Sequence, residues 1–173
     1  MGALNEVDQI LVVDDDINVA NAIARCLTQR SRLHDLFRTV QEDAHMNAAQ
    51  LNPASISVQI SNSAEHAMKM AAQIEFSCVI ADYRMPGTDG AQFLANFSEK
   101  QPDCATILMS GAGQMEGVVI ALDLAHIHAF IPKPWVDFEL RAALAQALAR
   151  RRVQIENRVL AEMCRARDLG AAG

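Results

Sequence analysis

Two groups of carboxylates in this sequence directly follow apolar runs. Asp82 comes after residues 76–81, and Asp14 and Asp15 come after residues 10–13. If both runs are neighbouring parallel strands, the acids meet at one edge of a sheet, where repulsion between like charges favours a bound cation. Oxygen ligands without Cys or His favour Mg²⁺. Taken singly, Asp82 is more typical of a turn cap, and the N-terminal acids of a helix N-cap.

A lone lysine and a lone serine end two further apolar runs. Lys133 stands between two prolines after residues 129–131, and Ser110 follows residues 105–109. A lysine fixed at a strand end can reach a carboxylate or an added phosphoryl group, and the Lys133–Pro134 bond is one that permits the cis form. Without the acids, a solvated lysine in a stiff turn is the simpler interpretation.

The elements that must position these residues are short buried strands alternating with helices. Runs such as residues 76–81 carry no charge, which is typical of strands covered on both faces. The carboxyl ends of such strands form the crevice where ligands bind in open α/β sheets. The spacing predicts strands over residues 9–13, 56–60, 76–81, 105–109 and 129–131. It predicts helices over residues 17–27, 64–74, 91–97 and 115–125 and from residue 137 onward.

Composition limits the possible functions. A chain of 173 residues with 51% hydrophobic content suits one domain with its own core. The net charge of −6 argues against direct nucleic-acid binding, and we expect the arginines at 150–152 to line a solvated helix face. The four cysteines show no disulfide or zinc spacing. Neither a membrane span nor an export signal is apparent, so a cytoplasmic protein is expected.

The order of these residues resembles the receiver domain of two-component response regulators. Asp-Asp follows the first predicted strand, Asp the third, Ser the fourth and Lys-Pro the fifth, and the stretch Asp82-x-x-Met85-Pro86-Gly87-x-x-Gly90 resembles the family's phosphoacceptor loop. The resemblance spans about residues 8–148. It implies a flavodoxin-like, doubly wound, three-layer α/β fold, in which a five-stranded parallel sheet carries helices on both faces.

The resemblance implies a phosphoacceptor response regulator. Asp82 would receive a phosphoryl group from the phosphohistidine of a histidine kinase or phosphotransfer protein. Lys133 would pair with the phosphoryl oxygens, and Ser110 would donate a hydrogen bond to one of them. The expected chemistry is therefore self-phosphorylation and dephosphorylation in a phosphorelay, and not an enzyme's turnover of a separate substrate.

The same resemblance implies a magnesium site. Asp15 and Asp82 would bind Mg²⁺ directly, Asp14 would bind it partly through water, and the backbone carbonyl of Arg84 would be a further ligand.

It also implies a switch. Ser110 would move toward the acyl phosphate, and Phe130 would turn inward to fill the space. The surface of the predicted elements 115–125 and 129–131 and the helix from residue 137 would then carry the signal to a protein partner.

Three other functions remain open. One is a Mg²⁺-dependent phosphohydrolase with Asp82 as nucleophile, although such enzymes usually have a second acid at the position of Arg84. Another is a flavodoxin-like nucleotide or flavin binder, which the acids 14–16 disfavour because they repel phosphate. The third is a degenerate receiver that binds its partners without phosphorylation.

Two segments exceed the family pattern. More chain lies between the first two predicted strands than a βαβ unit needs, so we expect a helical insertion over about residues 30–55 within a receiver domain of residues 1–148. Residues 149–173 form an expected helical extension, which would project roughly 30 Å. We expect a homodimer, formed either through the signalling surface or through this extension as a coiled coil.

Overall fold

Five parallel strands form the central sheet. The structure, a computed structural model, describes residues 7–29, 55–111 and 127–171, with side chains to residue 167. The sheet has the order β2-β1-β3-β6-β7, and every pair of neighbours in it is parallel. The strands are β1 (Asp8–Val13), β2 (Ile56–Ser61), β3 (Cys78–Asp82), β6 (Ala105–Ser110) and β7 (Ala129–Pro132).

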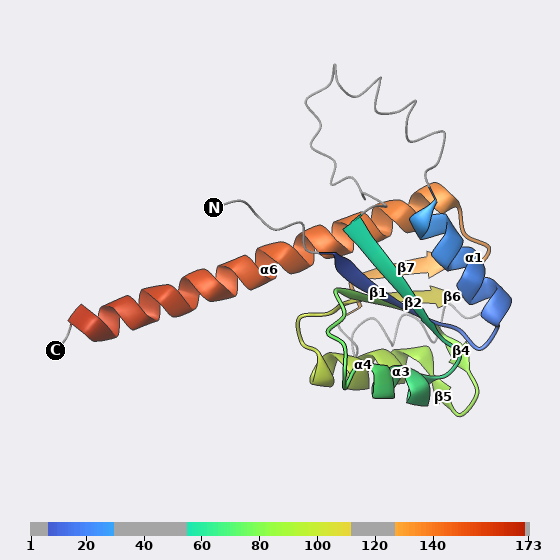
Figure 1. The fold of residues 1–173 in the computed structure, drawn as a ribbon, viewed down its shortest axis with the longest axis horizontal. Helices are drawn as coiled ribbons and strands as arrows, with labels where there is room; N and C mark the ends of the chain where they lie inside the picture. The colour runs from blue at the N-terminus through green and yellow to red at the C-terminus, as the bar shows by residue number, and fades with distance from the viewer. Residues whose placement is uncertain (1–6, 30–54, 112–126, 172–173) are drawn as a thin grey trace, which may run out of the picture.

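Helices cover both faces of the sheet (Figure 1). One face carries α1 (Ile17–Thr28) and the first part of α6 (Asp137–Ala171), and the other carries α3 (Ala64–Met70) and α4 (Gly90–Lys100). Alternate residues of β1 enter the two cores: Ile10 packs with the α1 and α6 side chains, and Leu11 with those of α3 and α4. Both are fully buried, as expected for a strand covered on both faces. The predicted three-layer receiver-like fold is thus confirmed.

Helix starts are fixed by local side-chain caps. The Asp16 carboxylate accepts a hydrogen bond of 2.8 Å from the Asn18 N–H and caps α1. Asp89 caps α4 in the same way through the Gln92 N–H at 2.7 Å. These contacts satisfy N–H groups that have no partner within the helix.

Element boundaries differ modestly from those expected. β3 begins at Cys78 and includes Asp82, α3 ends at Met70 in a turn, and α4 is one turn longer than predicted. A two-stranded antiparallel hairpin, β4 (Arg84–Met85) with β5 (Thr88–Asp89), follows β3. The hairpin contains Gly87 at φ 84°, a conformation that favours glycine. The Lys133–Pro134 bond is cis.

Two expectations lie outside the described residues: the helical insertion, of which only residue 55 is described, and the helix over 115–125. Within the described part of the chain, no helix is both long and apolar enough to cross a membrane.

The last helix is far longer than the sheet requires. α6 has 35 residues, which corresponds to about 50 Å at ~1.5 Å per residue. Leu140, Leu144 and Leu148 are buried against the sheet, whereas residues 156–167 are all exposed. The far half of α6 therefore projects from the body, as Figure 1 shows.

Candidate functional site at the carboxyl edge of the sheet

The carboxyl ends of β1, β3 and β7 lie level with one another. Val13 pairs with Ala81, so Asp14 and Asp82 follow at the same height on adjacent strands. On the other side of β3, Asp82 pairs with Met109 of β6, which pairs with Ile131 of β7. The parallel register alone therefore brings residues from distant parts of the chain to one edge.

Three carboxylates gather at this edge. Asp14, Asp15 and Asp82 have carboxylate oxygens within 4.8 Å of one another, and they are the only group of three or more potential metal-binding side chains in the described ranges. Asp14 is 2% exposed and Asp82 is 9% exposed, whereas Asp15 is open to solvent. Two buried carboxylates this close repel each other unless a cation lies between them.

Lys133 supplies that positive charge. Its Nζ lies 2.6 Å from Asp14 Oδ2 and 2.7 Å from Asp82 Oδ1. The lysine is fixed by its backbone as well, because its N–H donates to the Ser110 carbonyl at 2.7 Å. The amine thus bridges the two acids from the end of β7.

Burial and pairing shift the pKa values of this group. Burial opposes the charged form of Lys133, but the hydrogen bonds and charges of Asp14 and Asp82 outweigh it and raise its pKa above the usual value. Burial raises the pKa of Asp14, and the contact with Lys133 offsets this only in part. The lysine therefore stays protonated between the acids at neutral pH.

Backbone groups hold the remaining carboxylate oxygens. Asp82 Oδ2 accepts a hydrogen bond of 3.1 Å from the Arg84 N–H, and Asp14 Oδ1 accepts one of 3.0 Å from the Asp16 N–H. The Gly90 N–H donates to the Tyr83 carbonyl at 2.7 Å and holds the start of α4 against the end of β3. The orientation of both acids is consequently fixed from two sides.

Ser110 and Phe130 lie near this edge. Ser110 ends β6 beside the site and is 1% exposed, and its hydroxyl donates to the Gly111 carbonyl at 3.4 Å. Phe130 lies in β7, is half-buried, and packs against the core on the α3 and α4 side. Arg84 is exposed in the hairpin that follows Asp82. All the residues singled out in the sequence thus lie at or next to one edge.

The residues expected to bind Mg²⁺ suit that ion. Three carboxylates and a backbone carbonyl are hard oxygen donors, and Mg²⁺ takes few protein carboxylates and keeps several waters. The exposed Asp15 leaves one side of the cluster open to water.

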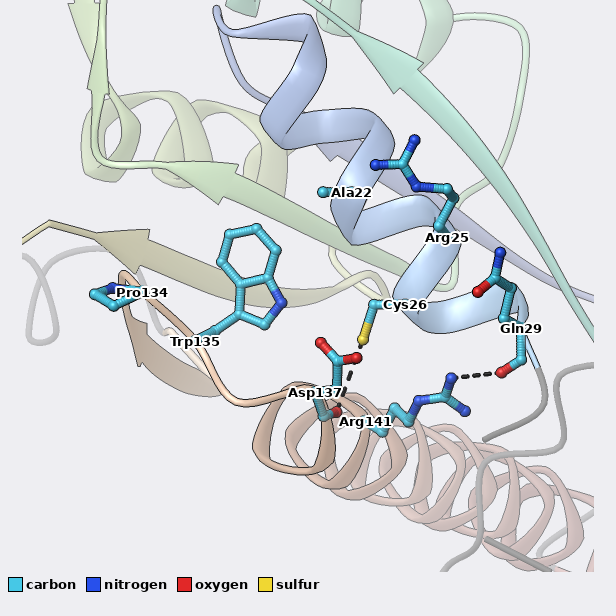
Figure 2. A pocket seen from close by; sticks show the side chains of 8 residues that line it. All are labelled: Ala22, Arg25, Cys26, Gln29, Pro134, Trp135, Asp137 and Arg141. Carbon is cyan, nitrogen blue, oxygen red and sulfur yellow. Dashed lines mark hydrogen bonds between the residues drawn. The ribbon is translucent and has the colours of Figure 1, made fainter. Parts of the chain in front are cut away.

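A separate cavity adjoins the segment that follows Lys133 and is lined by Pro134 and Trp135 (Figure 2). Its volume is about 510 Å³, and it opens between α1 and the start of α6. Trp135, two residues after Lys133, forms one wall, and Arg25 and Arg141 face it from the two helices. The Arg141 Nε is buried and has no hydrogen-bond partner among the residues that the structure describes. This cavity could not be predicted from the sequence, because its lining comes from α1 on one side and from residues 134–141, more than a hundred residues later, on the other.

Two arginines of α6 make contacts with the body that the sequence did not predict. The expected solvated face of residues 150–152 holds for Arg150 and Arg152, of which Arg152 is 59% exposed, but two of the three arginines also contact the body. Arg152 Nη2 lies 2.5 Å from Asp8 Oδ2, and Arg151 Nε donates to the Asp103 carbonyl at 2.7 Å. Asp8 is only 6% exposed at the start of β1. The available signal was Asp8, an acid next to an apolar run with no cation close to it in the sequence. A buried charge of this kind needs a partner from elsewhere in the chain.

Comparisons with known proteins agree with the geometry. The model of the response regulator receiver domain matches residues 41–145. The match begins inside the long segment between α1 and β2, so β1 with Asp14 and Asp15 lies outside it.

Two similar proteins are named as transcriptional regulatory proteins. The hydrogenase transcriptional regulatory protein HoxA of Cupriavidus necator is 27% identical over 139 residues, which are 80% of this chain and 24% of that protein. The transcriptional regulatory protein FixJ of Bradyrhizobium diazoefficiens is 30% identical over 98 residues, 57% of this chain and 47% of FixJ. The chain thus spans at most about half the length of these relatives.

Solved structures share the fold. The signal receiver domain of an HD domain-containing protein from Pseudomonas fluorescens superposes with a TM-score of 0.67 at 22% identity, covering 90% of this chain and 97% of that one. Because the family model matches more than half of the residues and the sheet has the same architecture, this chain belongs to the response regulator receiver domain family.

Proposed function

We propose that this chain is a phosphoacceptor receiver in which Asp82 takes a phosphoryl group from a phosphohistidine. One observation carries the proposal: Lys133 Nζ lies within 2.7 Å of a carboxylate oxygen of Asp14, which directly follows β1, and of Asp82, which ends the neighbouring strand β3. Phosphoryl transfer depends mainly on positioning and on neutralising charge, and this arrangement supplies both.

In the proposed reaction an oxygen of the Asp82 carboxylate attacks the phosphorus. The bond between phosphorus and the donor imidazole nitrogen breaks, and its electron pair stays on that imidazole. The Arg84 N–H, 3.1 Å from Asp82 Oδ2, orients the nucleophile. Lys133, already beside Asp82, would pair with the transferred phosphoryl oxygens.

Magnesium is part of the proposal. Asp14, Asp15, Asp82 and the Arg84 carbonyl would hold the ion, with Asp14 acting partly through water. Bound Mg²⁺ would neutralise charge on the phosphoryl oxygens. The close approach of the three carboxylates supports this assignment.

Ser110 and Phe130 are the proposed switch. Ser110 would turn its hydroxyl from the Gly111 carbonyl toward the acyl phosphate, where its hydrogen bond is stronger because the acceptor is charged. The half-buried Phe130 would then move further inward, which burial of its ring favours.

The proposed partners are a histidine kinase or phosphotransfer protein and a second copy of this chain. Pairing of two copies would use the surface of residues 115–125, β7 and α6, or the projecting part of α6. The cytoplasmic location, the absence of direct nucleic-acid contact and the domain limits of 1–148 and 149–173 also remain proposals. HoxA and FixJ are named as transcriptional regulators, so an output domain elsewhere in the natural protein is compatible with this function.

Mass spectrometry after incubation with acetyl phosphate and Mg²⁺ tests the proposal. We expect one added phosphoryl group in the wild-type chain and none in Asp82→Asn. Asp89→Asn is a matched control, because Asp89 is an exposed acid that caps α4 near the site. Multiple turnover of a phosphomonoester would support the phosphohydrolase instead, and absence of any added group would support a degenerate receiver.

A further inference from the structure

The cavity between α1 and the start of α6 has the size of a small-molecule site (Figure 2). Its volume of about 510 Å³ lies within the range of roughly 300–1,000 Å³ that ligand pockets in proteins span. Its walls come from α1, from residues 134–135 and from the first turns of α6. The described residues that line it do not include Asp14, Asp15 or Asp82. The cavity is therefore a candidate binding site separate from the acidic edge.

One part of the cavity wall is apolar and flat. Trp135, the only tryptophan in the chain, is half-buried and extends its indole ring toward α1. Pro134 lies next to it, and Ala22 and Cys26 line the side formed by α1. Burial raises the pKa of the Cys26 thiol to about 11, so this side chain is neutral. A flat apolar ring could thus be buried between the indole and α1.

Two arginines and one acid bring charge to the same cavity. Arg141 donates from Nη2 to the Gln29 carbonyl, while its buried Nε has no hydrogen-bond partner among the described residues. Arg25 is exposed, and its side chain forms no ion pair with any residue in the described ranges. Asp137 also lines the cavity. Two cations and one anion leave this space with one net positive charge.

These charges favour a ligand with a single carboxylate. A carboxylate can accept two parallel N–H bonds from one guanidinium group. It would also supply an acceptor for an arginine whose buried Nε is unpaired, which is a costly state for a polar group. A phosphate monoester carries nearly two negative charges, so the carboxylate of Asp137 would repel it more strongly.

We propose that this cavity binds a small aromatic carboxylate, whose charged group contacts Arg141 and Arg25 and whose ring lies against Trp135. The proposal goes beyond the phosphoryl transfer proposed above and does not depend on it. The ligand is recognised by the combination of one negative charge and a flat apolar ring, which matches the two kinds of wall in the cavity.

Titration with cinnamate tests the ligand class, and cinnamamide is the matched neutral probe. Calorimetry should show at least about tenfold tighter binding of the carboxylate, because only it forms charge-assisted hydrogen bonds. Trp135 supplies the only indole N–H signal in the NMR spectrum of this chain, and cinnamate should shift it. Absence of cinnamate binding, equal affinity for both probes, or binding that leaves the indole signal unmoved would overturn the proposal.

Arginine variants test the proposed contacts. Arg141→Gln should weaken cinnamate binding at least about tenfold, and Arg25→Gln about threefold, since water screens the exposed group more. Arg150→Gln is the matched control, because Arg150 is exposed on α6 outside the cavity lining. Unchanged affinity in Arg25→Gln or in a folded Arg141→Gln, or an equal loss in Arg150→Gln, would contradict these contacts.

Exchanging the acid tests the charge balance. Asp137→Asn removes one negative charge and keeps a polar side chain of the same size at the start of α6. The variant should therefore bind phenyl phosphate at least about tenfold more tightly than the wild-type chain does. Affinity for phenyl phosphate that does not change would overturn the assignment of a ligand with a single charge.

Two further measurements separate this site from the proposed function. Asp82→Asn should bind cinnamate with wild-type affinity, and Arg25→Gln should still gain one phosphoryl group from acetyl phosphate. A wild-type chain that binds cinnamate but takes no phosphoryl group would overturn only the proposed function. A chain that is phosphorylated but does not bind cinnamate would overturn only the present inference.

Discussion

At the scale of single residues, Lys133 determines whether the acidic edge is stable without metal. Its amine lies between Asp14 and Asp82, and both carboxylates are nearly buried. Removing one partner of such a pair leaves unpaired charge in a region of low dielectric. The lysine is therefore both a structural cation and the proposed partner of the phosphoryl group.

Lys133→Met should lower the free energy of unfolding of the metal-free protein by about 1–3 kcal/mol, because two close carboxylates lose their counter-charge. Added Mg²⁺ should recover part of that loss by binding the folded state. Urea unfolding with and without Mg²⁺ measures both effects. Lys69→Met is the control, since the Lys69–Glu65 pair is exposed and screened by water and should contribute much less to stability. Equal losses in the two variants would contradict the proposed role of Lys133.

Two glycines follow Asp82 closely in the sequence, and they differ in how much room a side chain would have. A Cβ at Gly90 would lie 2.0 Å from the Asp82 carbonyl oxygen, whereas one at Gly87 would meet no atom within 4 Å. Gly87 has φ 84°, so there the difficulty is conformational. The close approach of α4 to the backbone of Asp82 thus depends on Gly90.

Gly90→Ala should destabilise the protein by at least about 2–3 kcal/mol, because the clash is with backbone that cannot rotate away. Gly87→Ala should cost only about 1 kcal/mol, which is the strain of a left-handed conformation. Thermal unfolding of both variants gives the comparison. A milder effect at Gly90 than at Gly87 would show that the start of α4 can shift freely away from Asp82.

At the scale of elements, the strands are set by their composition, whereas tertiary structure sets the contacts of Arg151, Arg152 and Arg158 with Asp8 and Asp103, here named the arginine latch. The apolar runs 10–13 and 78–81 are short, uncharged and rich in β-branched residues, a composition that favours buried strands. The far half of α6 has no such local determinant. Its direction depends on Asp8 and Asp103, which lie far from it in sequence.

The latch should weaken in acid. The hydrogen bonds from Arg158 lower the pKa of Asp103 below its model-compound value of 3.8. Because the pKa of Asp103 is lower in the folded state than in the unfolded state, the contact stabilises the docked helix fully at pH values above the unfolded-state pKa. This stabilisation is lost as the pH falls through the folded-state pKa. Hydrogen exchange of the amides of residues 151–160, corrected for intrinsic rates, should show protection falling below about pH 4. Asp103→Asn should reduce protection near neutral pH and remove that step, and an unchanged profile would argue against the latch.

At the scale of the whole molecule, burial separates the four cysteines into two classes. Burial raises the pKa of Cys26 to about 11 and that of Cys104 to about 12. Burial also raises the pKa of Cys78 well above its usual range. Cys164 is exposed on the projecting part of α6. The body therefore protects three thiols, and the extension carries the fourth in solvent.

Thiol labelling near neutral pH should consequently detect one fast-reacting cysteine per chain, and four after denaturation. Because the thiolate is the reactive form, the three buried thiols should react only as fast as the domain opens. Cys164→Ser should remove the fast reaction and leave the slow ones unchanged. Fast labelling of Cys26 in that variant would mean that α1 and α6 separate readily.

The sequence by itself determined the alternation of strands and helices, the parallel three-layer fold and the candidate residues at the strand ends. These features follow from local composition, since uncharged apolar runs become buried strands and parallel strands bring their carboxyl ends to one edge. The roles proposed for Asp82, Lys133 and Ser110 rest on their meeting at this edge.

Only the tertiary structure decided which charges pair. Lys133 contacts both Asp14 and Asp82, and the arginines of α6 are divided between the body and solvent. A charged side chain carries no periodic signal of its partner, since its reach and its burial depend on elements distant in sequence. For the same reason the cavity beside Trp135 exists only in the folded chain, where α1 and α6 lie side by side.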